Sequence, residues 1–285
     1  MSQAFTAACI QVTSGRDPAA NVETVSAKVR AAHASGADFI MTPETTDMME
    51  PRRKLGFEKA QPEATHEALA AFKALAAELE IWLLLGSLVV RQSEDRLANR
   101  SFLIDPKGGI AACYDKIHMF DVDVPDGQTY RESKAYRPGS KAVLADLPWG
   151  RLGMTVCYDL RFPALYRSLA QAGADFLTVP SAFTRVTGQA HWHCLLRARA
   201  IETGCFVFAP AQCGEHAEGR ETYGHSLIVA PWGEVLADGG EEPGIVTARI
   251  EPAKVAEARA MIPALGHDRV FSPPIMAAPL REAGE

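Results

Sequence analysis

Residues 153–163, GMTVCYDLRFP, carry the strongest local signal in the chain. Residues 154–156 are apolar and partly β-branched, which indicates a buried strand. Pro163 suits the first position of a helix, because a proline there gives up no hydrogen bond. Cys157 therefore falls at a strand-to-helix turn, where open α/β sheets hold their ligands. From this stretch alone, a buried structural cysteine and a reactive thiol are equally good interpretations.

Composition narrows the class of protein. The chain has 285 residues, of which 47% are hydrophobic, so it can bury a sizeable core. Its net charge is −6, so the chain lacks the excess of basic residues that is typical of proteins that bind nucleic acid. No apolar run approaches the roughly 20 residues of a membrane span, and nothing near the N-terminus resembles a signal peptide. The six scattered cysteines are typical of a reducing compartment, so we expect a cytoplasmic protein.

Apolar strands and amphipathic helices alternate along the chain. Strands are predicted over 5–12, 38–41, 81–90, 100–104, 110–114, 141–147, 151–156, 175–179, 206–211, 224–229, 235–237 and 245–250. Helices are predicted over 22–35 (with Asn21 as its cap), 65–80, 163–173, 189–203 and after Pro252. Because helices separate pairs of strands, we expect two sheets packed face to face with helices outside, a four-layer α-β-β-α sandwich. No shift in composition divides residues 1–285, which are expected to form a single domain.

Three segments carry further information. Residues 115–140 are polar and lack a sustained period, and they predict a long ordered loop. The sequence Gly-Ala-Asp-Phe occurs at 36–39 and again at 173–176, in each case at the junction of a predicted helix and a predicted strand, so the second half repeats this pattern of the first. The tail from about residue 263 is rich in proline and polar residues, and we expect it to dock on a surface or a partner.

Three ionisable residues outside 153–163 could act with Cys157. Glu44 follows the strand 38–41, Lys116 closes the strand 110–114, and Glu132 lies in the long loop. Alone, Lys116 is most simply a surface residue, Glu44 is equally well a helix-capping or surface residue, and Glu132 is uninformative. A thiol at its ordinary pKa is only a few per cent thiolate at neutral pH, so Cys157 needs a base, which Glu44 can supply. Lys116 and the backbone N–H of Tyr158 can hold the oxyanion that forms when a carbonyl is attacked.

With these residues combined, the chain resembles the nitrilase, or carbon–nitrogen hydrolase, superfamily. The resemblance rests on TPE (42–44), YDKIH (114–118) and VCYDLRFP (156–163), in the family's order, and on PSAF (180–183), LLRARAIET (195–203) and YGHSLIVAPWGEV (223–235). It implies a Glu-Lys-Cys triad of Glu44, Lys116 and Cys157 on the α-β-β-α sandwich. It also implies that Glu132 positions the lysine and the substrate. Arg161 is expected either to bind a substrate carboxylate or to pair with a loop aspartate.

Within the superfamily, segments 116–125 and 131–133 are typical of the Nit-type amidases, and 209–214 is more similar to deaminated-glutathione amidases than to omega-amidases. The resemblance implies hydrolysis of a 2-oxo acid amide through a thioester with release of ammonia. It implies no metal, no organic cofactor, and a homodimer or larger assembly. Omega-amidase activity on 2-oxoglutaramate, N-carbamoyl amino acid hydrolysis and aliphatic amide hydrolysis are alternatives that the sequence leaves open.

Two other interpretations of the sequence, a zinc site and a non-catalytic protein, are less favoured. His191, His193 and Cys194 suggest zinc, but residues two apart on a helix point to different faces. A non-catalytic interaction protein is disfavoured because all members of the triad and Glu132 are present. One departure leaves the substrate open: His193 stands where the family usually has a glutamate, in AHWH (190–193).

Overall fold

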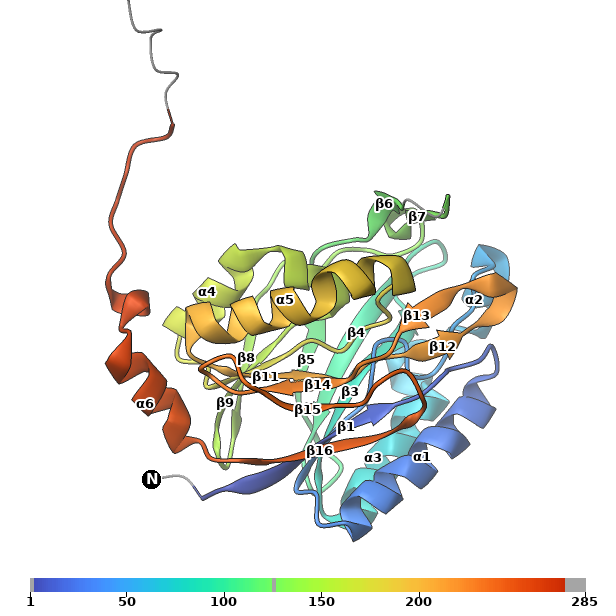
Figure 1. Ribbon diagram of the computed structural model, residues 1–285. Coiled ribbons are helices and arrows are strands. Elements are labelled where there is room, and N and C mark those ends of the chain that lie inside the picture. Colours follow the sequence, from blue (N-terminus) through green and yellow to red (C-terminus); the bar gives the residue numbers. More distant parts are fainter. Residues whose placement is uncertain (1–2, 125–126, 275–285) are drawn as a thin grey trace, which may run out of the picture.

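Two six-stranded sheets form the centre of the protein (Figure 1). The structure is a computed structural model, and it describes residues 3–124 and 127–274. The first sheet has the order β16 (Gly244–Ile250), β1 (Phe5–Gln11), β2 (Phe39–Met41), β3 (Trp82–Arg91), β4 (Leu97–Ile104) and β5 (Ile110–Asp115). The second has the order β15 (Val235–Asp238), β14 (Leu227–Val229), β11 (Phe206–Ala209), β10 (Phe176–Thr178), β9 (Gly150–Met154) and β8 (Val143–Leu147).

The two sheets have the same pairing pattern. Strands β1, β2 and β3 are parallel to one another, as are β9, β10 and β11, and the outer strands of both sheets are antiparallel. The repeated Gly-Ala-Asp-Phe explains part of this likeness, since Phe39 begins β2 and Phe176 begins β10. Gly36 and Gly173 have φ values of +88° and +100°, which favour glycine at the turn before each strand.

Helices cover both outer faces of the pair of sheets. Helices α1 (Pro18–Ala34) and α3 (Glu67–Leu79) lie against the first sheet, while α4 (Pro163–Gln171) and α5 (Arg185–Thr203) lie against the second (Figure 1). Along β1, Ala7 and Cys9 face the other sheet, whereas Ala8 and Ile10 pack under the helices, as the two-residue period of a strand requires. The predicted four-layer α-β-β-α sandwich is confirmed.

Aromatic side chains join the two sheets. Phe39 of the first sheet meets Phe208 of the second, edge to face, with ring centroids 6.1 Å apart. Phe5 meets Phe176 in the same manner at 5.6 Å and stacks on Trp149 at 4.3 Å. Such pairs stabilise a core beyond their burial, by about 0.5–1.5 kcal/mol each.

The first helix begins earlier than the sequence predicts. Asp17 caps it by accepting a hydrogen bond from the Ala19 N–H at 3.0 Å, and Pro18 takes the first helical position. Asn21 is therefore not the cap. It lies inside the helix, buried, and its side-chain amide donates to the backbone oxygens of Gly15 and Asp47.

The segment 115–140 is more ordered than a loop. It contains a two-stranded hairpin of β6 (Asp121–Asp123) and β7 (Thr129–Arg131), followed by the 3₁₀ turn η2 (Glu132–Lys134). Sequence reasoning also missed α2 (Arg53–Lys59) and the hairpin of β12 (Cys213–Glu215) and β13 (Glu221–Tyr223). These elements are too short for a hydrophobic period to show in the sequence.

The remaining elements are η1 (Glu63–Thr65), η3 (Cys157–Arg161), η4 (Ala217–Gly219), η5 (Ala264–Gly266) and α6 (Ala253–Met261), which follows Pro252 as predicted.

Among the helices of residues 3–124 and 127–274, none has the length and the apolar character to cross a bilayer. The end of the predicted docking tail, residues 275–285, and position 125 of the motif 116–125 lie outside the described residues.

Candidate active site

Cys157 lies in a sharp turn between β9 and α4. Its φ of +49° is in the left-handed region, which costs a residue other than glycine about 1 kcal/mol. Its N–H donates to the oxygen of Pro180, which follows β10, at 3.0 Å. α4 begins at Pro163, as the sequence predicts. The turn is therefore held by the neighbouring strand and turns the thiol towards the edge where the parallel strands end.

A buried carboxylate ties this turn to the segment that carries Lys116. Asp159 is fully buried and accepts hydrogen bonds from the Tyr114 hydroxyl at 2.7 Å and the Val156 N–H at 2.9 Å. Its other oxygen accepts from the His118 N–H at 3.0 Å. Sequence reasoning gave Asp159 no role. The signal was a carboxylate two residues after the thiol in a largely apolar stretch, where a buried charge needs several donors.

Glu44 follows β2 and points into the same region. One carboxylate oxygen, Oε1, accepts from Lys116 Nζ at 3.0 Å and from Asn99 Nδ2 at 2.8 Å. The other, Oε2, accepts from the Ala182 N–H at 2.8 Å. The side chain is only 4% exposed. Three donors from different parts of the chain thus fix the orientation of this carboxylate.

Lys116 lies between two carboxylates. Its Nζ contacts Glu132 Oε2 at 2.8 Å as well as Glu44. Glu132 opens η2, and its Oε2 also accepts from the Phe120 N–H at 2.7 Å. The structure therefore brings together all four of the residues that the sequence singled out on β-strand ends and in the 115–140 segment, and the lysine ammonium contacts both glutamates.

The charges in this cluster shift the pKa values of its members. Burial lowers the pKa of Lys116, but the charges of Glu132 and Glu44 outweigh it and hold the pKa well above the ordinary lysine value. Burial also raises the pKa of Glu44, yet the Lys116 ammonium, the Cys157 thiol and the Ala182 N–H bring it below the usual value. At neutral pH, Lys116 is an ammonium and Glu44 a carboxylate.

The thiol of Cys157 has a raised pKa. Burial is the main cause and the adjacent negative charge of Glu44 is the second, while Lys116 opposes both. The resting pair is therefore a thiol beside a carboxylate, not a thiolate beside an acid. Such a pair can move the proton from sulfur to carboxylate when an electrophilic carbon is presented to the sulfur.

The residues after the thiol form a polar and aromatic rim. Within the described residues, no acceptor is bonded to the Tyr158 N–H, which leaves this donor open. Arg161 lies over the Phe183 ring, with its Cζ 5.3 Å from the centroid, and its Nη2 is 3.3 Å from His191 Nδ1. The ion pair with a loop aspartate that the sequence left open for Arg161 does not form among residues 3–124 and 127–274.

Asn99 is a site residue that sequence reasoning missed. Its Nδ2 donates to Glu44 Oε1 at 2.8 Å and to Glu132 Oε1 at 3.1 Å, so one amide joins both carboxylates. It is buried, and its Oδ1 has no hydrogen-bond partner in the described part of the chain. The predicted strand began at 100, whereas β4 begins at Leu97, which puts Asn99 inside the sheet.

The histidines considered as zinc ligands separate in the structure. His191 turns to Arg161, while His193 Nε2 lies 3.0 Å from Asp238 Oδ2 on a different side of α5. In the part of the chain that the structure describes, the one group of three or more possible metal ligands is formed by His193, His225 and Asp238. It contains none of the residues of the cluster around Cys157.

Comparisons with known proteins place the chain in a family. Residues 6–260 match the model of the carbon-nitrogen hydrolase family. A deaminated glutathione amidase of Synechocystis sp. is 41% identical over 272 residues, which cover 94% of this chain and 98% of the relative.

Solved structures show the same relationship. The C. elegans NitFhit protein superimposes with a TM-score of 0.88 at 36% identity, covering 94% of this chain and 66% of that longer chain. Saccharomyces cerevisiae Nit3, a member of branch 10 of the nitrilase superfamily, superimposes with a TM-score of 0.83 at 27% identity, covering 92% of this chain and 96% of Nit3. The chain thus belongs to the carbon–nitrogen hydrolase family, on its nitrilase-type Nit branch, and is a hydrolase of carbon–nitrogen bonds other than peptide bonds.

Proposed function

We propose that the protein is a cysteine amidase that hydrolyses deaminated glutathione or a related 2-oxo acid amide through a thioester. The observation that carries the mechanism is the contact set of Glu44, Lys116 and Glu132 beside the buried Cys157 thiol. The substrate class is supported by the relatives named deaminated glutathione amidase at about 40% identity.

The first half of the reaction forms the thioester. Glu44 takes the proton of the Cys157 thiol while the sulfur bonds to the amide carbon, and the carbonyl π electrons move to oxygen. The Lys116 ammonium and the open Tyr158 N–H donate to this oxyanion, the largest source of stabilisation in acyl transfer. The oxyanion then reforms the carbonyl, the C–N bond breaks, and the nitrogen leaves with the proton held by Glu44.

The second half releases the acid. Glu44 accepts a proton from water while the water oxygen bonds to the thioester carbon. The same two donors hold the second oxyanion. When the carbonyl reforms, the C–S bond breaks and the sulfur regains a proton from Glu44. Lys116 keeps its charge throughout, because Glu132 and Glu44 flank it and hold its pKa high. Neither a metal nor an organic cofactor takes part in these steps.

Arg161 is the proposed anchor for a carboxylate of the substrate. It lies four residues after the nucleophile and has a planar guanidinium suited to bidentate binding. Within the described chain its guanidinium contacts His191 and aromatic rings but no carboxylate. The leaving group separates the candidate substrates. A primary amide such as 2-oxoglutaramate releases ammonia. Deaminated glutathione carries its amide on a dipeptide and releases that dipeptide as an amine, so the ammonia release expected from the sequence applies only to a primary amide substrate.

The test compares four substrate classes at matched concentration: deaminated glutathione, 2-oxoglutaramate, an N-carbamoyl amino acid and a simple aliphatic amide. We expect kcat/KM to be highest for deaminated glutathione, with amine release, and to fall by at least about 10³-fold in Cys157→Ala. The same loss is expected in Cys157→Ser, which keeps the shape of the side chain. A chelator should leave the rate unchanged.

Each alternative has its own outcome. Faster ammonia release from 2-oxoglutaramate would identify an omega-amidase, and preference for either remaining class would reject the 2-oxo acid. Full activity in Cys157→Ser would reject the thioester. An inactive wild-type protein with all four classes would favour the non-catalytic interaction protein.

The cellular location and the oligomeric state are also proposals. We propose a cytoplasmic enzyme, which its six free cysteines support, because oxidising compartments convert such thiols to disulfides. We propose a single domain over residues 1–285 that forms a homodimer, with the tail from about 263 docked on the body or the partner. Arg167 of α4 binds two groups of this tail, the Asp268 carboxylate and the Ala264 oxygen, which supports docking on the body.

A further inference from the structure

Outside the active site, three side chains of the kind that bind transition metals converge. His193 lies on α5, His225 precedes β14, and Asp238 ends β15. His193 Nε2 is 3.0 Å from Asp238 Oδ2, and His225 Nδ1 is 2.9 Å from Asp238 Oδ1. The three ligand atoms lie within 4.8 Å of one another. Ligand atoms around a tetrahedral zinc ion, each bonded at about 2.0–2.2 Å, are about 3.3 Å apart, so small side-chain shifts would complete the set.

The orientation of each ligand is already restricted. The His225 ring stacks on the Tyr223 ring with centroids 4.4 Å apart, and the His193 ring meets His225 edge to face at 5.1 Å. Asp238 Oδ1 also accepts from the Gly240 N–H at 2.9 Å. Neighbours that fix the ligand orientation strengthen metal sites, because less side-chain freedom is lost when the ion binds.

The backbone at His225 is a second, independent observation. Its φ is +52°, a conformation that costs histidine about 1 kcal/mol and that clusters at functional positions. The conformation is maintained from both sides: the His225 N–H donates to the Gly240 oxygen at 2.6 Å, and its oxygen accepts from Trp192 Nε1 at 2.8 Å. This strained conformation brings the His225 ring up to Asp238.

We propose that His193, His225 and Asp238 bind one zinc ion, with water in the fourth position, and that the ion links α5 to β15. Two imidazoles and one carboxylate suit zinc and other late first-row metals, whereas magnesium and calcium take oxygen ligands. The side chains are 36%, 20% and 35% exposed, so the ion can enter from solvent. When it binds, the proton on each ligating nitrogen leaves for solvent or moves to the other ring nitrogen.

The site shares no residue with the cluster around Cys157, so this proposal is independent of the proposed function. The proposal assigns a metal-binding role to His193, the residue that stands where the family usually has a glutamate. The alternative is that the two histidines and Asp238 form only a hydrogen-bonded bridge. His193→Gln separates these cases, since glutamine can still donate to Asp238 but is a poor ligand for zinc.

The experiment uses the untagged full-length protein, stripped with a chelator, incubated with ZnCl₂ and dialysed. Mass-spectrometric metal analysis should find about one zinc per chain in the wild type, with affinity reduced at least about tenfold in His193→Gln and in Asp238→Asn. In excess zinc the wild-type Tm should rise by about 3–6 °C, and that of His193→Gln should not. Magnesium and calcium should leave every Tm unchanged.

Two control variants exclude other zinc ligands. Cys194→Ala removes an exposed thiol next to His193, and His33→Ala removes an exposed histidine of α1. Both should bind zinc as the wild type does. Cobalt, added in place of zinc, should give visible absorption in the wild type that is absent in His193→Gln. The proposal is overturned if the wild type retains no zinc after dialysis, or if His193→Gln and Asp238→Asn retain as much as the wild type.

Discussion

At the scale of single residues, the buried polar groups around Cys157 share a small number of donors. Glu44 and Glu132 both depend on Lys116 and on the amide of Asn99. A charged group taken out of water is stable only with such partners, and each charge-assisted hydrogen bond contributes about 1.5–3 kcal/mol. The cluster therefore orients the Glu44 carboxylate, the proposed base, and the Lys116 ammonium before substrate arrives.

Asn99→Ala tests this positioning role. It removes one donor from each carboxylate, and a carboxylate that loses a donor has a higher pKa. We expect kcat/KM to fall about 10- to 100-fold and the acidic limb of the pH–rate profile to move to higher pH. The measurement is the pH dependence of kcat/KM. Ser101→Ala, at a buried position two residues along the same strand, is the control and should keep the profile. An unshifted acidic limb in Asn99→Ala would contradict the role.

His216 predicts how stability responds to acid. It is buried, and burial together with the charge of Arg220 outweighs its hydrogen bond to the Ser14 oxygen and lowers its pKa from 6.5 to about 4. Between these values the unfolded chain binds more protons, so the contribution of His216 is fully present above pH 6.5 and is lost as the pH falls towards 4. The loss amounts to about 3 kcal/mol.

Urea unfolding at several pH values between 7 and 4 measures this loss. His216→Gln should flatten the fall in unfolding free energy with decreasing pH, because glutamine does not titrate. His33→Gln, at an exposed position on α1, should keep the wild-type slope. Equal slopes in His216→Gln and the wild type would show that other groups cause the acid sensitivity.

At the scale of elements, the irregular middle of β3 positions the loop that carries Glu44. The pairing of β3 with β4 shifts between Leu85 and Leu88. There, Ser87 Oγ accepts from the Thr45 N–H at 2.8 Å, and the Thr46 N–H donates to the Ser87 oxygen at 2.9 Å. A bulge in a strand is a common way to direct a side chain beside a site.

Gly86 makes this close approach possible. A Cβ at position 86 would lie 2.1 Å from the Thr42 oxygen and 2.5 Å from Pro180 Cβ. We expect Gly86→Ala to reduce the unfolding free energy by about 1–3 kcal/mol and to lower kcat more than KM changes, because the loop holding Glu44 must move. Chemical denaturation and steady-state kinetics measure the two effects. Gly56→Ala, in open space within α2, is the control and should be neutral or stabilising. A fully active Gly86→Ala of wild-type stability would contradict this assignment.

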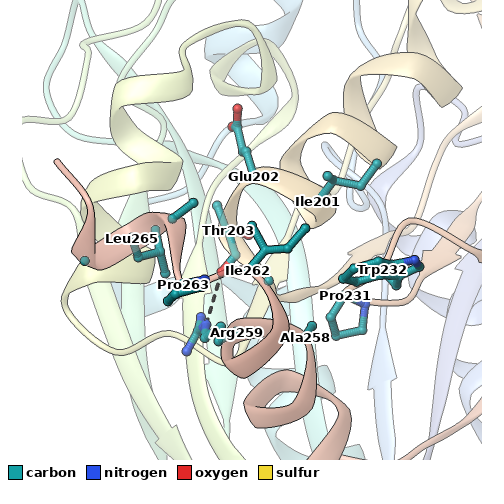
Figure 2. A pocket seen from close by; sticks show the side chains of 13 residues that line it. Ile201, Glu202, Thr203, Pro231, Trp232, Ala258, Arg259, Ile262, Pro263 and Leu265 are labelled. Atoms are coloured by element: carbon teal, nitrogen blue, oxygen red, sulfur yellow. Dashed lines mark hydrogen bonds between the residues drawn. The ribbon is translucent and has the colours of Figure 1, made fainter.

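At the scale of the whole molecule, one cavity lies away from the residues around Cys157. It measures about 470 Å³ and lies between the end of α5, the turn at Pro231 and Trp232, and the segment from α6 to η5 (Figure 2). Several large apolar side chains nearby are exposed, including Trp232 at 50%, Ile201 at 56% and Ile262 at 59%. Apolar groups gathered in this way at a surface are typical of protein–protein contacts, which supports the proposed homodimer.

Trp232→Glu tests this surface. A buried, unpaired carboxylate in a dimer contact is costly, so we expect the variant to be monomeric under conditions in which the wild type is a dimer. Sedimentation velocity at several protein concentrations measures the state. Ile110→Glu, at a 38% exposed position on β5, is the control and should remain a dimer. A monomeric wild type would reject the homodimer, and a dimeric Trp232→Glu would move the interface elsewhere.

The sequence by itself was enough to predict the family, the layers and the residues proposed to react. Strand ends next to Glu44, Lys116 and Cys157 were visible in local apolar runs, and the alternation of strands and helices was enough to predict the sandwich. Local patterns are sufficient there because a strand or an amphipathic helix depends mainly on its own residues and their period. The functional motifs are also contiguous, so the family resemblance could be read directly from them.

Only the tertiary structure decided which distant side chains meet. Asn99 reaches both carboxylates because β4 pairs with β3 and β5, and His193, His225 and Asp238 converge because α5 packs over the end of the second sheet. No local pattern encodes these contacts, since they depend on strand register and on the packing of layers far apart in the chain. The sequence therefore determined which groups can react, and the packing of the sheets and helices determined how they are oriented and what else lies beside them.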